Sequence, residues 1–173
     1  INIELVKITT SGDKILDKPL YAIGGKSLFL KELEQALLDN DCDIAVHSMK
    51  DMPAELHEDL TISAILERED SRDVLISKKY RSLSDFTNTS SIGTSSVRRI
   101  CNIKYEYPNI RISDMRGNID TRINRVLDGN MDGIILAAAG VIRLGLEKYI
   151  TSYMDKKIWI PAIGQGAIGL ESR

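Results

Sequence analysis

Cysteine is scarce in this sequence, which has only Cys42 and Cys101 among its 173 residues. The two lie far apart and form no CxxC pair, so their spacing argues against a zinc site and against a framework of disulfides. We expect both to be ordinary reduced thiols, and we predict no metal site.

Long apolar runs and net positive charge are also missing. No apolar stretch approaches the roughly 20 residues that cross a bilayer, and the first residues, INIELVKITT, lack the regions of a signal peptide. The formal net charge of −2 gives no overall basic field for a nucleic acid. We therefore expect a cytoplasmic protein without membrane or nucleic-acid partners, in which any anion site is local.

The sequence does contain an alternation of strand-like and helix-like segments, and its 43% hydrophobic residues are enough for a core in one domain or two small lobes. Apolar patterns predict strands at residues 1–9, 43–46, 61–66, 74–77, 91–93, 110–113 and 133–137. Stripes of helical period predict helices at residues 28–40, 95–107, 118–129 and 140–150. This order indicates an α/β fold with mainly parallel sheets and helices on both faces. The charged stretch EREDSRD, residues 67–73, predicts a boundary between two lobes.

Arginines follow three successive predicted strands of the second lobe. Because the carboxyl ends of parallel strands meet at one edge of a sheet, side chains that follow these strands are expected to lie close together. Glycines and hydroxyl residues in the same turns leave backbone N–H groups at helix starts, which favour anions. The alternative, a solvated helix arginine paired with a nearby acid, explains one such residue better than five. The five are Arg98, Arg99, Arg116, Arg122 and Arg143.

The chemistry of these side chains indicates a ligand with several carboxylates or phosphates, since a guanidinium binds either group with two parallel hydrogen bonds. The segment GGKS, which ends with Lys26 and Ser27, resembles the end of a phosphate-binding loop. That motif requires glycine at position 20, which is Leu20 here, so a nucleoside-triphosphate site is rejected. Lys26 follows two flexible glycines, from where it could reach a bound anion; a solvated lysine is the alternative.

One acid stands out, in the segment DIAVHSMKDMP at residues 43–53. Asp51 follows the carboxyl end of a predicted strand and is expected near the cationic edge, where it stays ionised. A carboxylate weakens a site that only holds anions, but it lowers the barrier of a reaction in which positive charge develops on the bound molecule. The alternatives are a turn residue paired with Lys50 for Asp51, and a structural histidine for His47.

Six motifs in this order, spread from end to end, resemble the porphobilinogen deaminase (hydroxymethylbilane synthase) family. They are GGKSLFLKELE, DIAVHSMKDMP, GTSSVRR, RGNIDTR, AAAGVIRLGL and PAIGQGAIGLESR. The resemblance implies a transferase of tetrapyrrole and haem biosynthesis that condenses four porphobilinogen molecules head to tail, releases ammonia each time and forms linear hydroxymethylbilane. It also implies a monomer with a dipyrromethane cofactor attached to a cysteine through a thioether. Acetate and propionate groups on every pyrrole ring would explain the arginines.

The resemblance also assigns roles by position. It implies that Asp51 is the catalytic aspartate, which stabilises the cation left when ammonia departs. The residues implied to bind the cofactor are Ser48, Lys50, Thr94, Ser96, Arg98, Arg99, Arg116 and Arg122. Those implied to contact the substrate are Lys26, Arg143 and Gln165.

The fold implied by the resemblance is the two-lobed architecture of type II periplasmic binding proteins, with a small third domain. The first lobe would comprise residues 1–67 and 161–173, and the second residues 68–160. The family's amino-terminal segment and its cysteine-bearing third domain are not found in this sequence, and neither Cys42 nor Cys101 matches the cofactor cysteine. Asp120 replaces a smaller residue and places a carboxylate close to the arginines, which puts the local arginine contacts in doubt.

Two other interpretations remain open at this point. A solute-binding module of the same fold would hold anions without reacting with them, since fold does not establish function. Asp51 beside Lys50 and the missing secretion signal favour an enzyme over such a module. The chain could also be an inactive piece of the enzyme.

Overall fold

The computed structural model describes residues 2–11 and 30–173, which divide into two compact units. Unit 1 comprises Ile1–Arg68 and Ala167–Arg173, and unit 2 comprises Glu69–Gly166. The chain therefore passes between the units twice. Residues 161–166, which the sequence analysis placed in the first lobe, group with unit 2, where the Gly166 carbonyl oxygen accepts a hydrogen bond from the Glu69 N–H over 3.1 Å. Among the described residues, no helix is long and apolar enough to cross a membrane.

Unit 1 contains a three-stranded sheet in the order β1-β8-β2, with strands β1 (Ala45–Ser48), β8 (Ile168–Ser172) and β2 (Thr61–Ile65). Helix α2 (Lys31–Leu38) packs on it through Leu37, which is fully buried with Ala45 and Leu60. The carboxyl end of β1 leads into a short 3-10 helix, η3 (Met49–Asp51). The first predicted strand is wrong as far as it is described, because residues 2–10 form no strand and Ile3 and Leu5 are exposed. A period-two pattern forms a strand only where a neighbouring edge accepts its hydrogen bonds.

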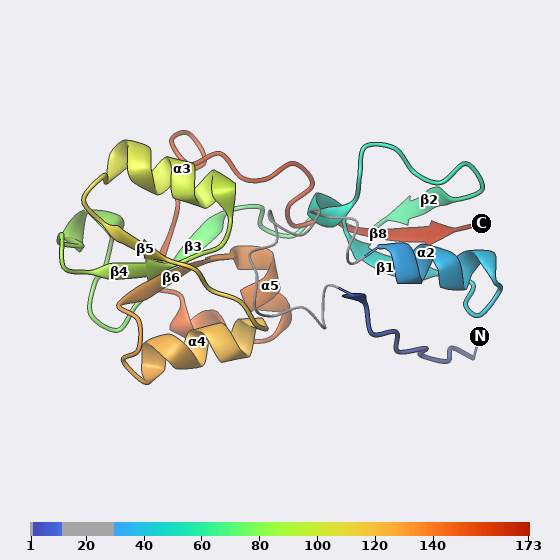
Figure 1. Ribbon diagram of the computed structural model, residues 1–173, viewed down its shortest axis with the longest axis horizontal. Helices are drawn as coiled ribbons and strands as arrows, with labels where there is room; N and C mark the ends of the chain where they lie inside the picture. Colours follow the sequence, from blue (N-terminus) through green and yellow to red (C-terminus); the bar gives the residue numbers. More distant parts are fainter. Residues whose placement is uncertain (1, 12–29) are drawn as a thin grey trace. The chain divides into compact units, whose positions relative to one another are not determined.

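Unit 2 contains a five-stranded sheet in the order β5-β4-β6-β3-β7 (Figure 1). Its strands are β3 (Asp73–Ile76), β4 (Ser91–Gly93), β5 (Arg111–Ser113), β6 (Gly133–Ala137) and β7 (Ser152–Tyr153). Strand β4 pairs in parallel with β5 and β6, whereas β3 runs antiparallel to β6 and β7. The unit 2 sheet is mixed, as predicted, whereas both pairings of the unit 1 sheet are antiparallel. Only two of the six described pairings are parallel, so the prediction of mainly parallel sheets is wrong. Strands β3 and β8 each follow one of the two passages of the chain from one unit to the other. Both run antiparallel to their neighbours, because no crossover helix before them returns the chain to the end of the sheet from which a parallel strand would start.

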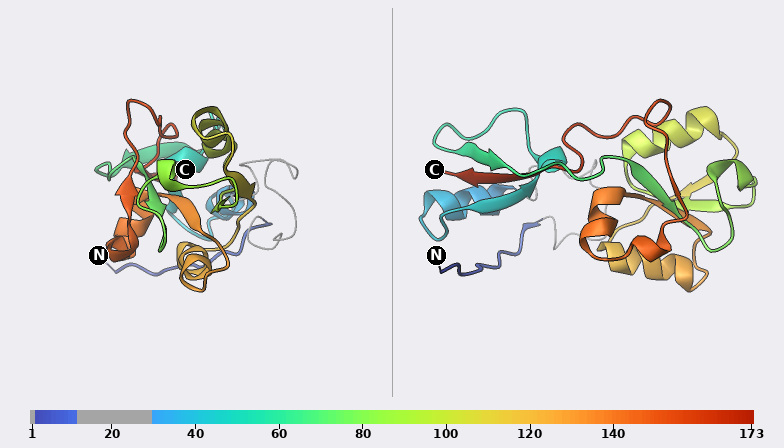
Figure 2. Two further views of the ribbon diagram at one scale, coloured as in Figure 1. Left: turned by 90° about the vertical axis from the view of Figure 1, so that its left-hand side faces the viewer. Right: turned by 180° about the vertical axis from the view of Figure 1, so that it is seen from behind.

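Helices cover both faces of this sheet, with α3 (Val97–Glu106) on one face and α4 (Ile119–Leu127) and α5 (Ala138–Arg143) on the other (Figures 1 and 2). Successive residues of a strand pack alternately against the two layers of helices. Leu75 and Ile135 pack with Ile103 of α3, while their strand neighbours Val74 and Ile134 pack against the α4 and α5 layer. The short 3-10 helices η4 (Leu83–Asp85) and η5 (Glu147–Tyr149) complete the unit.

The predicted helices α3 and α4 are confirmed to within three residues at each end, but the predicted helix at residues 140–150 is wrong in its extent. Helix α5 ends at Arg143, and Gly145 adopts a φ of +65° that closes the helix. The chain then continues into the short 3-10 helix η5 and does not extend α5.

The arrangement of strands in unit 2 defines one functional edge. The carboxyl ends of the parallel strands β4, β5 and β6 lie at this edge, and antiparallel β3 begins there, since Asp73 pairs with Ala137. We call this end of the sheet the carboxyl edge. The turns that leave β4, β5 and β6 are the segments for which the sequence analysis predicted an anion site.

Gly166, the last residue of unit 2, allows a close backbone contact. Its φ is +93°, and a Cβ atom would clash with the Glu69 carbonyl oxygen. Gly166→Ala is therefore expected to lower the free energy of unfolding by about 2 kcal/mol, measured by urea denaturation. Gly129→Ala is the control, because Gly129 has a φ of +78° but no atom within 4 Å of a Cβ. Equal losses for the two variants would contradict a specific contact at Gly166.

Candidate functional site

The first group of candidate residues lies at the carboxyl end of β1 in unit 1. Ser48 ends the strand, and η3 carries Lys50 and Asp51. The Met49 N–H donates to the Ala167 carbonyl oxygen over 3.1 Å, which fixes this turn to the start of β8. Asp51 is exposed, and none of the described residues holds its carboxylate in a hydrogen bond or ion pair. The catalytic role of Asp51 and the alternative of a turn residue paired with Lys50 both stay predictions.

Two buried titratable groups lie behind this turn. The Nε2 of His47 and the Oε2 of Glu171 are 2.9 Å apart, with side chains 6% and 0% exposed. Burial lowers the pKa of His47 and raises the pKa of Glu171. Burial also raises the pKa of nearby Glu34, and the charge of Glu171 raises it further. His57 and His47 have the opposite effect and lower this pKa. Burial thus favours the neutral form of His47, and its interpretation as a structural histidine stays a prediction.

This environment predicts how Glu171 affects stability. Its pKa is raised in the folded state, so its contribution to stability is present below the ordinary pKa of glutamate and is lost as the pH rises through the folded value. Glu171→Gln removes this loss, and the variant is expected to gain stability relative to the wild type between about pH 5 and about pH 8. Urea unfolding across this range measures the difference, with exposed Glu55→Gln as control. If the free energy of unfolding of the wild type instead rose relative to that of the Glu171→Gln variant as the pH rises, the fold would stabilise Glu171 as a carboxylate.

The second group of candidates surrounds the carboxyl edge of unit 2. The turn after β4 contains Thr94, Ser95 and Ser96, and the side chain of Ser95 ties it to the next turn. Its hydroxyl donates to the Met115 carbonyl oxygen over 2.6 Å and accepts from the Met115 N–H over 3.0 Å. Thr94 is buried, and its Oγ1 accepts from the Ser96 N–H over 3.2 Å. The two predicted anion-binding turns are thus held side by side.

Three of the predicted arginines form a cationic cluster at this edge. Burial lowers the pKa of Arg122, and the charges of Arg99 and Arg116 lower it further, while Asp114 opposes them. The Arg122 Nε also donates to the Gly117 carbonyl oxygen over 2.6 Å, which folds the side chain back over the turn after β5. Like charges held this close are unfavourable by themselves and are stabilised by a bound anion.

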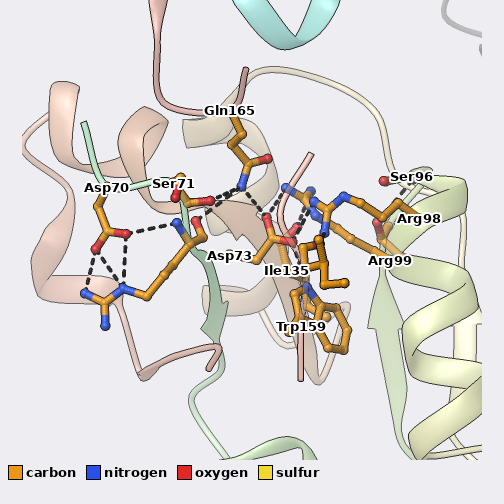
Figure 3. A network of polar contacts seen from close by, with 12 residues as sticks. Asp70, Ser71, Asp73, Ser96, Arg98, Arg99, Ile135, Trp159 and Gln165 are labelled. Atoms are coloured by element: carbon orange, nitrogen blue, oxygen red, sulfur yellow. Dashed lines mark hydrogen bonds and ion pairs between the residues drawn. The ribbon is translucent and has the colours of Figure 1, made fainter. Parts of the chain in front are cut away.

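The structure adds an acid that the sequence analysis missed. Asp73 is 0% exposed, and its carboxylate accepts three hydrogen bonds and forms an ion pair with Arg98 (Figure 3). Oδ1 accepts from Arg99 Nη2 over 2.7 Å and from Gln165 Nε2 over 3.0 Å. Oδ2 accepts from Trp159 Nε1 over 2.7 Å and forms an ion pair with Arg98 Nη2, also over 2.7 Å. A charged residue directly before the apolar strand VLI was the available signal, but it was taken only as part of a charged boundary.

Burial alone would raise the pKa of Asp73. Arg99, Arg98 and the indole N–H of Trp159 outweigh this effect and hold the pKa at about 2. Asp73 is therefore ionised at any physiological pH. It neutralises part of the charge that Arg98 and Arg99 bring to the carboxyl edge.

The remaining candidates are placed as follows. Arg143 donates from Nη2 to the Gly166 carbonyl oxygen over 2.7 Å, and Gln165 donates to the Ser71 carbonyl oxygen over 2.7 Å. Asp120 is exposed and its Oδ1 accepts from the Thr121 N–H over 2.8 Å. Lys26 lies outside the described residues. Among the described residues, no cluster of His, Cys, Asp and Glu side chains could hold a metal ion.

Comparison with known proteins places this arrangement in context. All of residues 1–173 match the family described as porphobilinogen deaminase, dipyromethane cofactor binding domain. The chain is 53% identical to the porphobilinogen deaminase of Syntrophomonas wolfei and 50% identical to that of Syntrophobacter fumaroxidans, over 100% of its own length. It spans 56% of the length of each of these relatives.

Solved structures resemble the chain in fold alone. A periplasmic substrate-binding protein of an ABC transporter from Coxiella burnetii is 12% identical with a TM-score of 0.51, over 80% of this chain and 67% of that one. The predicted α/β fold of type II periplasmic binding proteins is confirmed, with a mixed sheet in unit 2 and helices on both faces of that sheet.

Proposed function

Because this chain belongs to the porphobilinogen deaminase family, we propose that the full-length protein is a hydroxymethylbilane synthase. It condenses four porphobilinogen molecules head to tail, releases one ammonia for each and forms linear hydroxymethylbilane. The enzyme is a transferase of tetrapyrrole and haem biosynthesis. A cytoplasmic location, a monomeric state and the lack of nucleic-acid binding stay predictions.

The carboxyl edge of unit 2 fits a dipyrromethane cofactor in its chemistry. Each pyrrole ring of the cofactor carries acetate and propionate groups, and guanidinium groups bind carboxylates with charge-assisted hydrogen bonds. The cationic cluster supplies such groups close together, with Asp114 as its opposing charge. The residues that would hold the cofactor there are Thr94, Ser96, Arg98, Arg99, Arg116 and Arg122. When bound, the cofactor supplies a covalent anchor for the growing chain.

Asp51 supplies the charge that the reaction needs. Loss of ammonia from porphobilinogen leaves a delocalised positive charge on the pyrrole, and a fixed carboxylate stabilises that charge as it develops. Asp51 is exposed, and the hydrogen bond from Met49 to Ala167 holds its turn in place. Ser48 and Lys50 flank it and would contact the ligand from the same turn, and Arg143 and Gln165 are the proposed substrate contacts of unit 2.

The observation that carries this proposal is that Ser95 joins two of the predicted anion-binding turns, since its hydroxyl bonds to both the carbonyl oxygen and the N–H of Met115 and brings the turns that precede Arg99 and Arg116 together. The test is incubation of the full-length protein with porphobilinogen, with ammonia and hydroxymethylbilane measured over time. Steady formation of both supports the proposal.

A binding module is the second candidate function, because the solved structures of the same fold include a periplasmic substrate-binding protein. Such a module would bind porphobilinogen without releasing ammonia. Saturable binding by calorimetry, combined with no ammonia above the rate of the free compound, would reject the enzyme in favour of the module.

A further inference from the structure

The proposed chemistry gives no role to Asp73, the most completely hydrogen-bonded acid of unit 2. The side chain is fully buried at the start of β3, and both oxygens are saturated by donors from Arg98, Arg99, Trp159 and Gln165. A carboxylate in this state has no face left for a ligand. Its effect on the site must act through the residues that it holds.

Those residues come from two separate parts of the chain. Arg98 and Arg99 lie in the first turn of α3, directly after the β4 turn, and therefore belong to the carboxyl edge. Trp159 and Gln165 belong to the segment that follows β7 and ends at Gly166, where unit 2 ends. Gln165 also donates to the Ser71 carbonyl oxygen, two residues before Asp73. One carboxylate thus joins the arginines to both ends of unit 2 (Figure 3).

The two arginines are oriented differently by this contact. Arg99 is 7% exposed and uses Nη1 on the Ile135 carbonyl oxygen and Nη2 on Asp73, so it is held inside the unit. The Arg98 side chain is 24% exposed, with Nη2 on Asp73 and Nη1 on the Ile160 carbonyl oxygen over 2.9 Å. A guanidinium has five N–H donors, so Arg98 keeps further donors in a fixed orientation on its exposed side.

We propose that Asp73 is a positioning residue of the carboxyl edge, which fixes Arg98 so that its remaining donors meet a ligand carboxylate. The proposal rests on the proposed function, because the ligand is the polycarboxylate assigned to that edge. Asp73 orients the Arg98 guanidinium, but its negative charge also neutralises part of the positive charge at the carboxyl edge.

The orienting effect of Asp73 and its negative charge change the affinity for an anion in opposite directions. If Asp73 acted only through its charge, its removal would increase the positive potential and strengthen the binding of an anion. If Asp73 positions Arg98, its removal frees the guanidinium to rotate and weakens binding, because the ligand must then order the side chain. The sign of the change in affinity separates the two effects, and a general loss of stability does not determine that sign.

The experiment compares the wild type with Asp73→Asn in the full-length protein prepared without its dipyrromethane cofactor, as checked by intact mass, using calorimetric titration with the polycarboxylate mellitate. The expected result is an affinity lower by about 10-fold, as for the loss of one charge-assisted contact. Asp132→Asn is the matched control, because Asp132 is a half-buried, hydrogen-bonded acid next to the amino end of β6, away from the carboxyl edge. Unchanged or tighter binding by the Asp73 variant would overturn the proposal.

A second pair of variants keeps the test decisive if Asp73→Asn does not fold because two buried cations lose their partner. Arg99→Gln is compared with the double variant Asp73→Asn, Arg99→Gln, which has no unpaired buried cation from Arg99. The proposal predicts about 10-fold weaker mellitate binding by the double variant than by Arg99→Gln alone, because Arg98 has lost its anchor. Equal affinities of the two would overturn it. A wild type that binds neither mellitate nor porphobilinogen would instead refute the anion site, and with it the proposed function.

Discussion

Asp51→Asn is expected to lower ammonia release by the full-length protein by about 100-fold or more, which corresponds to roughly 3 kcal/mol of lost stabilisation. Asparagine keeps the size and most of the hydrogen bonding of the side chain but removes its charge. Asp51 is exposed in η3 and supports no contact within the described residues, so folding is expected to survive. The measurement is the initial rate of ammonia release per cofactor-loaded enzyme, with loading checked by intact mass.

Asp51→Glu is the matched variant, since it keeps the charge and moves it by one methylene group. It is expected to retain more activity than the amide, because the charge is what the departing ammonia requires. An Asn variant that is fully loaded and works at a near-normal rate would show that Asp51 is only a turn residue.

The double variant Arg116→Leu, Arg122→Leu is expected to reduce cofactor loading and binding of porphobilinogen-derived chains by at least about 100-fold. Each desolvated guanidinium contact is worth on the order of 2 kcal/mol, so the loss of two such contacts corresponds to a factor of about 100 or more. Loss of the mutual repulsion between these cations offsets part of any structural cost. The fraction of protein that carries a pyrrole adduct, measured by intact mass, reports the effect.

Arg125→Leu provides the comparison, because Arg125 is an exposed residue of the same helix and lies outside the cationic cluster. It is expected to load and turn over like the wild type. If the double variant and Arg125→Leu load equally well, the assigned edge is not the binding site.

The strands and helices of unit 2 were largely predictable from the sequence because their patterns are strong. Strands β3 and β6 are continuous apolar runs, and each is buried on both faces of the sheet. The hydrophobic stripes of α3 and α4 have the helical period, and Ile103 and Ile123 of these stripes are buried. The rule that parallel strands end at one edge then indicated which turns meet there.

Other features depend on tertiary contacts that a local pattern does not contain. Strand β8 has the sequence IGLES, in which a glycine and two polar residues obscure the period, yet it is the central strand of the unit 1 sheet. The antiparallel direction of β3 was not predicted because alternating strands and helices were taken to imply parallel pairing. That direction is what brings Asp73, at the start of β3, to the carboxyl edge.

The candidate site likewise contains some features that were predictable from the sequence and others that depend on tertiary contacts. The arginine clustering was predictable in outline, since spacing alone placed Arg116 and Arg122 after the same strand. The partner of Arg98 and Arg99 was not, because Asp73 comes from a strand whose direction was misjudged. The roles of Asp51, Ser48, Lys50 and the other site residues stay predictions that the variants above test.

The intact mass of the full-length protein, before and after incubation with porphobilinogen, tests the central claim most directly. A hydroxymethylbilane synthase is expected to show a covalent dipyrromethane adduct, and further pyrrole units should add to it in steps when substrate is supplied. Peptide mapping should locate this adduct on a cysteine other than Cys42 and Cys101. A mass that equals the polypeptide alone, and that does not change with porphobilinogen, would contradict the account.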